Sequence, residues 1–503
     1  LSVVRPPTDT VSTGPGQSRA MTDDALDTLL ASVSERVTPA AAERERLQTV
    51  ADELAVRAED AIDGLPVEAD TVQVGSSARS TWLAGDRDID LFVRFPPDLD
   101  REQLEQYGLD VGHHVLPDGH EEYAEHPYVK GEYEGFDVDL VPCYAVDAAT
   151  DIRSAVDRTP FHDAYLQARY TPELAEGARL LKRFLKGIGV YGSDLRTEGF
   201  SGYLVELLVL EYGGFRPLVE AAAEWHPPVE FDLRRTEDEG PAVVRPEEQE
   251  AAAFDDPLVV IDPTDPDRNV AAVLSKSNLA RFQHYCRELL ADPAAELFFP
   301  ESAKPLDAAG VRTHVERRGS HPVAVVFDAP AVVEDQLFPQ LRRSLEGVRG
   351  ELDRRGFDPL RAATFAADAA GSDGNGDAPD DAESWGRAIL LVETSVASLP
   401  AVERHEGPPV HVGEHARSFY EAYAADDSVY GPFVDGDRYV VEREREHRTP
   451  EAFLHSDALF DVALGAHVES ALRREYEVLV GEELAEVADD FGAELRAYFE
   501  PGI

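Results

Sequence analysis

The stretch GSSARSTWLAGDRDID, from Gly75 to Asp90, begins with Gly-Ser and ends with two aspartates two residues apart. Apolar residues surround the aspartates, and residues 89–95 are typical of a β-strand. Because side chains alternate between the faces of a strand, Asp88 and Asp90 share one face. Two carboxylates on one face repel each other unless a cation lies between them. The D-x-D spacing therefore predicts a half-site for Mg²⁺, a hard ion bound by carboxylates together with substrate phosphates.

A D-x-D pair alone is more typical of a solvated strand edge in an acidic protein, but its surroundings favour the metal site. Gly75 and Ser76 follow a short strand over residues 71–74 and precede a helical turn predicted over residues 77–84. Backbone N–H groups and a hydroxyl at such a start suit phosphate oxygens. Arg79 lies one turn later and can face the same anion.

A third carboxylate comes from the strand-like segment FDVDLVPCY, which begins at Phe136. Asp137 and Asp139 share one face of this segment, and strand geometry alone does not choose between them. A two-metal site for phosphoryl transfer needs about three carboxylates.

The charge of the chain indicates a salt-rich environment. Asp and Glu number 99 against 47 Lys and Arg, which gives a net charge of −52, and only five of the basic residues are Lys. Molar salt screens such self-repulsion within about 3 Å. The composition predicts a halophilic protein, and it does not exclude nucleic acid, because contacts at high salt depend on shape, stacking and local Arg side chains.

A chain of 503 residues is too long for one core, so two to four domains are expected. No apolar run approaches the ~20 residues that span a bilayer, so no membrane partner is expected. Cys143 and Cys286 are far apart in sequence and form no metal-ligand pattern, which favours a reducing, cytoplasmic location.

The segments predict an α+β chain with a disordered tail at 1–20, a catalytic head at 21–162, a helical neck or central domain at 163–300, and a ferredoxin-like body with a helical tail at 301–503. Either Met21, the single Met, is the initiator, or residues 1–20 are a dispensable tail. The neck is interrupted by a polar, Pro-rich connection over residues 225–260. The body follows a β–α–β–β pattern, residues 470–499 read as helix, and residues 366–384 read as an acidic inserted loop.

Several motifs together resemble the archaeal (class I) CCA-adding tRNA nucleotidyltransferases, which belong to the polymerase-β-type nucleotidyltransferase superfamily. The similarity extends from about residue 40 to the end of the chain and is densest before residue 290. The motifs are GSSARSTWLAGDRDIDLF, DVDLVPCY, SAVDRTPFH, RLLKRFLKGIGVYG, GFSGYLVELL, DRNVAAVLS and LARFQHYCRELL.

The resemblance implies that CCA is added to the 3′ end of tRNA from CTP and ATP, with repair of damaged ends, and that Asp88, Asp90 and Asp139 bind Mg²⁺. The family often has Glu where this chain has Asp88, whose shorter arm reaches less far. The nucleotide contacts that the resemblance implies are Ser76, Arg79, His162, Lys182, Tyr191 and Arg268.

The residues themselves fit these roles to different degrees. Lys182 is expected to face away from the buried stripe of its helix, either toward a nucleotide or toward solvent. Tyr191 can contact a nucleotide or pack, and His162 without the resemblance reads as structural. Arg268, in the base-selecting pocket that the resemblance implies, is expected at the start of a helix capped by Asp267.

Two other functions stay open at this point. The same catalytic head could serve a poly(A) polymerase or another RNA nucleotidyltransferase, and a non-catalytic RNA-binding protein could retain a decayed head. The presence of all three candidate carboxylates argues against decay. The oligomeric state stays open as well, a homodimer included.

Overall fold

The computed structural model describes residues 15–123, 125–233, 254–368 and 385–503, with side chains described from residue 22 onward within these ranges. Contacts divide the chain into one unit that ends at Ser302 and a second that runs from Ala303 to Gly502. Both units combine helices with sheets, which confirms the α+β class. Among the described residues, no helix is long and apolar enough to cross a membrane.

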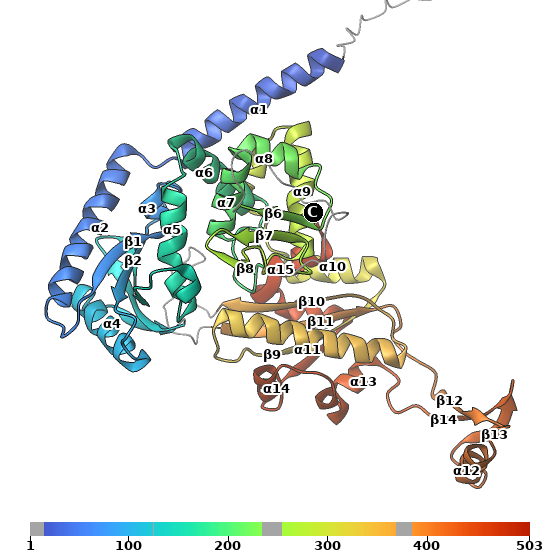
Figure 1. Ribbon diagram of the computed structural model, residues 1–503. Helices are drawn as coiled ribbons and strands as arrows, with labels where there is room; N and C mark the ends of the chain where they lie inside the picture. Colours follow the sequence, from blue (N-terminus) through green and yellow to red (C-terminus); the bar gives the residue numbers. More distant parts are fainter. Residues whose placement is uncertain (1–14, 124, 234–253, 369–384) are drawn as a thin grey trace, which may run out of the picture. The chain divides into compact units, whose positions relative to one another are not determined.

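The first unit contains a five-stranded sheet in the order β1-β2-β5-β4-β3. Its strands are β1 (Asp70–Val74), β2 (Asp88–Phe95), β3 (His120–Tyr123), β4 (Pro127–Tyr133) and β5 (Phe136–Tyr144). Strands β2 and β5 are parallel, and the other neighbours are antiparallel. Helices α2 (Ala41–Ile62) and α4 (Arg101–Val115) cover one face, and α3 (Gly75–Arg79) and α5 (Thr159–Gln167) pack near the β1 edge (Figure 1).

The alternation of β2 decides which of its side chains are buried under the helices. Ile89, Leu91 and Val93 are at most 2% exposed and join the core formed with α2 and α4. Because this face takes the apolar side chains, Asp88 and Asp90 lie on the opposite face, as the sequence predicts.

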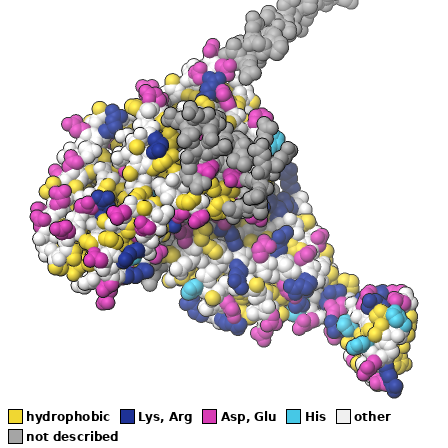
Figure 2. Space-filling view, viewed as in Figure 1, with side chains coloured by type: hydrophobic (Ala, Val, Ile, Leu, Met, Phe, Trp, Pro, Cys, Tyr) yellow, Lys and Arg dark blue, Asp and Glu magenta, His cyan; other side chains and the backbone are white. Residues whose placement is uncertain are grey.

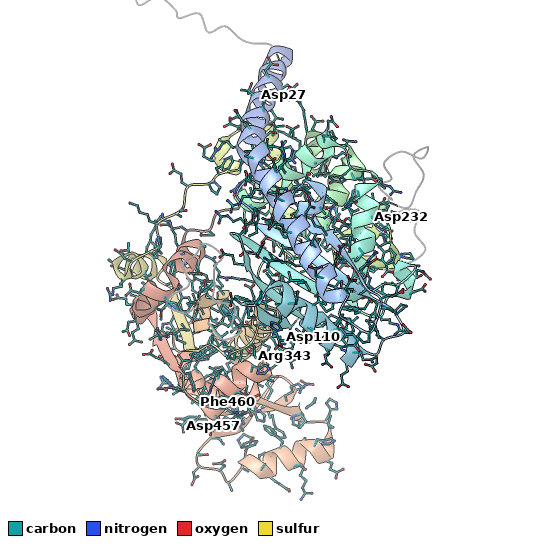
Figure 3. The ribbon with its side chains drawn as sticks, turned by 90° about the vertical axis from the view of Figure 1, so that its left-hand side faces the viewer. Asp27, Asp110, Asp232, Arg343, Asp457 and Phe460 are labelled. Carbon is teal, nitrogen blue, oxygen red and sulfur yellow. The ribbon has the colours of Figure 1, made fainter. Side chains whose placement is uncertain are left out.

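Helix α1 (Pro15–Val37) corrects the predicted tail. The tail was expected to reach residue 20, but the helix begins at Pro15, and proline at the first helical position fits that start; residues 1–14 lie outside the described part. Helix α1 packs against α6 and α9. Arg216 ties it to the neck, with Nη1 2.7 Å from Asp27 Oδ1, a side chain labelled in Figure 3.

The rest of the first unit is mainly helical. Its helices are α6 (Pro172–Gly187), α7 (Gly202–Tyr212), α8 (Phe215–Ala222) and α9 (Lys276–Ala291). They share one core of buried residues in which Phe184, Phe282 and Phe298 are fully buried.

A small sheet in this region was missed by the sequence analysis. Strands β6 (Val229–Asp232), β7 (Leu258–Asp262) and β8 (Asp265–Asn269) pair in the order β6-β7-β8. The connection expected over residues 225–260 therefore contains β6 and the start of β7, while residues 234–253 lie outside the described part. Alternating burial of Val229 and Phe231 explains β6, which is too short to give a strong sequence pattern.

The second unit has the strand order expected for a ferredoxin-like sheet. Strands β9 (His321–Asp328), β10 (Pro359–Asp368), β11 (Trp385–Thr394) and β15 (Glu477–Val480) form an antiparallel sheet in the order β10-β11-β9-β15. Helices α10 (Ala308–Arg318), α11 (Glu334–Arg355) and α15 (Ala488–Phe499) accompany it. The helical tail expected over residues 470–499 was partly wrong, because it contains β15, whose Val478 and Leu479 are buried.

The remaining elements of the second unit lie between β11 and β15. They are β12 (Val402–Pro409), α12 (Gly413–Tyr423), β13 (Tyr430–Asp435), β14 (Arg438–Glu444), α13 (Pro450–Leu454) and α14 (Ala466–Leu472). Of the acidic loop expected over residues 366–384, residues 366–368 belong to β10, and residues 369–384 lie outside the described part. Figure 2 shows Asp and Glu side chains scattered over the visible surface among Lys and Arg.

Candidate active site

Four aspartates lie on the face of the parallel pair β2 and β5 that is turned away from α2 and α4. The strand register places Asp88 beside Asp137 and Asp90 beside Asp139. Neighbouring strands lie about 4.8 Å apart, so each pair brings two carboxylates side by side. The register thus separates two residues that the sequence left equivalent: Asp139, and not Asp137, is the direct neighbour of Asp90.

Crowding of like charges raises the pKa of the carboxyl groups on this face. Burial is the largest cause for Asp90, and Asp139 and Asp88 add to it, so that the pKa of Asp90 rises to about 7 although nearby Arg79 opposes the rise. The pKa of Asp88 is also raised, by burial and then by Asp86 and Asp137. A cation bound between these oxygens would remove the repulsion.

The Gly-Ser turn lies directly against this face. Gly75 follows β1 with φ +78°, and a Cβ atom on residue 75 would overlap the Asp90 carboxylate. Only glycine allows this approach without strain. Helix α3 begins at Gly75, earlier than predicted, and ends at Arg79 because Ser80 is left-handed with φ 58°. Ser76, the residue that follows Gly75 in this turn, is half-buried.

The donor chemistry of the face fits a divalent metal ion. Carboxylate oxygens are the ligands that Mg²⁺ prefers, and here they share one face under mutual repulsion. In the described residues, however, no group of three or more Asp, Glu, His or Cys side chains lies close enough to hold an ion as it stands. The ligand set of Asp88, Asp90 and Asp139 stays a prediction.

Arg79 takes part in a buried charge network. Its Nε and Nη2 atoms donate to Glu206 Oε2 at 3.0 and 2.7 Å, and Nη1 donates to Asp163. Glu206 on α7 is fully buried, and Asp163 on α5 is 3% exposed. The structure therefore places the guanidinium between two carboxylates of the neck, where it fixes the Gly-Ser turn.

Lys182 joins the same network, which corrects the orientation expected for it. The residue is 3% exposed instead of facing away from the buried stripe of α6. Its Nζ atom lies 3.3 Å from both Glu206 Oε1 and Thr81 Oγ1. Burial lowers the pKa of Lys182, and the nearby Glu206 carboxylate opposes that lowering.

Tyr191 lies near enough to Asp86 and Asp88 for their charges to affect its hydroxyl. Lys186 Nζ lies 5.4 Å from the centre of the Tyr191 ring and 3.6 Å from Asp86 Oδ1. The ring is partly buried and packs against the helical core. Its position is compatible with both roles weighed for it.

His162 and Arg268 meet at a carboxylate that the sequence analysis did not single out. Asp262 Oδ2 accepts hydrogen bonds from His162 Nε2 and from Arg268 Nη1, both at 2.8 Å. Arg268 lies on β8, so the predicted helix start was wrong. The reason is Asn269, whose side chain pairs with the β7 backbone at Val260 and Leu258 and holds the segment as a strand.

Two residues of this region were therefore missed, Glu206 and Asp262. Each leaves a faint signal in the sequence, because each is a carboxylate within or at the end of an apolar run, YLVELLVLEY and LVVID. Acidic residues are almost never fully buried unless they are paired. That rule would have predicted cationic partners, but it could not name them.

Three family models match the chain in succession. The model of a nucleotidyltransferase domain matches residues 58–162, that of the second domain of tRNA nucleotidyltransferase matches 176–299, and that of the C-terminal domain of CCA-adding enzyme matches 318–371 and 380–481. The first match covers the carboxylate face and the Gly-Ser turn.

Several relatives match nearly the whole chain in sequence. The chain is 62% identical to a CCA-adding enzyme of Halorubrum lacusprofundi and 58% identical to one of Haloarcula marismortui, covering 95% of this chain and 99% of each relative. A CCA-adding enzyme of Methanosarcina barkeri is 37% identical over 93% of this chain and 97% of its own length. The chain belongs to the archaeal CCA-adding enzymes.

Proposed function

We propose that this chain adds C, C and A to the 3′ end of tRNA, without a template, from CTP and ATP, with release of pyrophosphate. The observation that carries the proposal is the register of β2 and β5, which pairs Asp90 with Asp139 beside the close-packed Gly75 turn. Carboxylates next to a phosphate-binding turn are what nucleotidyl transfer requires. Repair of tRNA ends that have lost part of CCA follows from the same reaction.

Each group of residues has a distinct task in this proposal. Ser76 and the backbone of the Gly75 turn hold phosphate oxygens of the nucleotide beside Asp90. Asp88, Asp90 and Asp139 would hold Mg²⁺, which lowers the pKa of an attacking hydroxyl and neutralises the leaving pyrophosphate. The terminal ribose 3′-OH of the tRNA attacks the α-phosphate, and the carboxylate face orients the two reactants.

Arg79 and Lys182 serve the nucleotide through the network around Glu206. Arg79 is 9% and Lys182 4% exposed in the side chain. Both side chains are paired with Glu206, and Arg79 also with Asp163, so we expect them to act on the nucleotide by holding the Gly-Ser turn that meets its phosphates. Tyr191 borders the same space, and Arg268 and His162 contact the base and a phosphate.

The proposed domains divide these tasks. Residues 21–162 form the catalytic head and 163–300 the neck that carries Arg268. Residues 301–503, with their ferredoxin-like sheet, bind the acceptor end of the tRNA by shape and backbone. The tRNA substrate and two free, buried cysteines favour a cytoplasmic enzyme, and sedimentation would test the open prediction of a homodimer.

The test is incorporation of labelled nucleotides into tRNA that lacks CCA, in molar KCl. CTP and ATP should be incorporated and UTP should not. Strong incorporation of UTP, or none of CTP, contradicts the proposal. A ladder of ATP additions on any RNA would indicate a poly(A) polymerase instead, and tight tRNA binding without metal-dependent incorporation would indicate a non-catalytic protein.

A further inference from the structure

The fully buried carboxylate of Asp262 lies beneath two side chains that reach the surface. His162 Nε2 and Arg268 Nη1 both donate to Asp262 Oδ2 at 2.8 Å. The side chain of Asp262 is 0% exposed, while those of His162 and Arg268 are 14% and 37% exposed. The buried Asp262 carboxylate thus binds one nitrogen of His162 and one of Arg268, and the rest of each side chain can reach a ligand.

The second oxygen of the same carboxylate is fixed by the protein framework. Asp262 Oδ1 accepts from the Thr264 backbone N–H at 2.9 Å and from Thr264 Oγ1 at 2.8 Å. The Tyr203 hydroxyl on α7 adds a longer contact of 3.4 Å. Because Oδ1 is held by the turn between β7 and β8, the carboxylate cannot rotate, and Oδ2 keeps one direction.

These contacts also define the state of His162. An ionised carboxylate only accepts hydrogen bonds, so the Nε2 atom of His162 carries the proton and the Nδ1 edge points away. Burial opposes ionisation of Asp262, but the contacts from His162 and Thr264 outweigh it and hold its pKa well below the ordinary range. The imidazole stacks on Tyr203 with ring centres 4.0 Å apart and an interplanar angle of 17°.

We propose that Asp262 is the positioning residue for nucleotide selection: it sets the direction of the Arg268 guanidinium toward the base and of the His162 ring toward a phosphate. The inference deepens the proposed function and rests on it. A guanidinium has five N–H donors in one rigid plane, so fixing one of them orients the rest. A site oriented in this way rejects a wrong base because its own polar groups are then left unpaired.

The test compares Asp262→Asn with wild type in incorporation of CTP, ATP and UTP. An amide of the same shape turns an N–H donor toward His162 or Arg268. The KM for CTP should rise about tenfold or more, and the preference for CTP over UTP should fall by a similar factor. The kcat at saturating CTP should change less, because the carboxylate face is untouched.

Asp265→Asn is the matched control, since Asp265 lies three residues on and pairs with Arg158 at 3.0 Å instead. Its preference among the nucleotides should equal that of wild type. In an Arg268→Ala background, Asp262→Asn should cause little further loss of preference, because it acts through Arg268.

The inference is overturned if a folded Asp262→Asn variant keeps the wild-type preference for CTP over UTP. It is also overturned if the loss of preference in this variant is fully additive to the loss in Arg268→Ala. Either result leaves the proposed function standing. No incorporation of CTP by wild type would overturn the proposed function with it. Where thermal unfolding shows that Asp262→Asn does not fold, Thr264→Val removes the 2.8 Å hydroxyl contact that holds Asp262 Oδ1. A measurable drop in preference there supports the inference, and unchanged preference contradicts it.

Discussion

The carboxylates of the first unit differ in how their negative charge is balanced, as Asp90 and Glu206 show. On the aspartate-bearing face of β2 and β5, Asp90 has Asp139 and Asp88 as neighbours, and its pKa rises to about 7. A short distance away, Glu206 is fully buried but accepts hydrogen bonds from Arg79, Thr81 and Lys182.

The proposed metal ion would balance the charge of the first group, whereas side chains of the protein balance the charge of Glu206. Buried charges are tolerated when they are paired and hydrogen-bonded, which Glu206 satisfies with side chains of this chain. The crowded aspartates face one another across parallel strands, which leaves a need for positive charge that a divalent ion and its nucleotide would meet. The first group is suited to chemistry, and the second to holding the Gly-Ser turn in place.

The largest expected effect comes from the crowded group. Asp90→Asn or Asp139→Asn should lower nucleotide incorporation by about a thousandfold or more, because several kcal/mol of transition-state stabilisation depend on the metal. Thermal unfolding should be unchanged or improved, since repulsion is removed. Incorporation kinetics and a melting curve, both in molar KCl, measure the two effects.

Asp137→Asn is the control on the same strand and face, paired with Asp88 instead of Asp90. It should retain at least about a tenth of the activity. Equal losses for Asp137→Asn and Asp139→Asn would show that the register does not select the ligand.

The next effect concerns the paired group. Glu206→Gln leaves Lys182 buried without its counter-charge and should lower the free energy of unfolding by about 3 kcal/mol. Denaturant titration followed by the fluorescence of Trp82 and Trp225, which lie in the same unit, measures it.

Glu211→Gln on the same helix is the control. Burial raises the pKa of Glu211, so removing its charge should cost less than about 1 kcal/mol. A similar cost for both variants would mean that Glu206 gains little from its pairing.

A smaller effect tests the contact that joins the turn to the crowded face. Gly75→Ala should cost about 1–2 kcal/mol, because φ is positive and the new Cβ meets the Asp90 carboxylate. Displacement of Asp90 should also lower incorporation. Gly85→Ala shares the positive φ, at +92°, but its Cβ would meet nothing within 4 Å. Full activity in Gly85→Ala beside reduced activity in Gly75→Ala isolates the contact, and equal activities would refute it.

The smallest effect extends the comparison to a paired carboxylate in the second unit. Glu393, 1% exposed on β11, is disfavoured as an anion by burial, but contacts from Arg318, Ser320 and Tyr498 outweigh this and lower its pKa. A folded-state pKa below the unfolded value stabilises the protein above the ordinary carboxyl range and loses that contribution as the pH falls through the folded value.

At neutral pH, Glu393→Gln should be less stable than wild type by about 0.5–1 kcal/mol. Acid unfolding followed by the fluorescence of Trp385, on the same strand, measures this difference. The gap should narrow as the pH falls. A gap that widens toward acid pH would mean that the pKa is shifted the other way.

The sequence predicted those helices and strands whose apolar residues recur with one clear period. The alternation in β2 fixed the face of Asp88 and Asp90, and the order of segments in the second unit predicted its ferredoxin-like sheet. The short strands β6 and β15 were missed because four residues carry too little periodicity. Lys182 was placed outward because its partner, Glu206, lies on another helix, and spacing along one helix cannot show it.

Within the site, the sequence named the aspartates of β2 and two choices on β5, and the register between the strands was needed to pair Asp90 with Asp139. Asp262 was out of reach for a related reason. Its partners His162 and Arg268 are brought together from α5 and β8 only by the fold.

Titration of Mg²⁺ into the protein, with unfolding measured at each concentration in molar KCl, tests the central claim most directly. Wild type should gain thermal stability with increasing Mg²⁺, because the ion relieves the repulsion around Asp90, and Asp90→Asn should gain little. Asp137→Asn should respond like wild type. An equal gain in wild type and Asp90→Asn would contradict the account, since the ion would then bind elsewhere than the crowded face of β2 and β5.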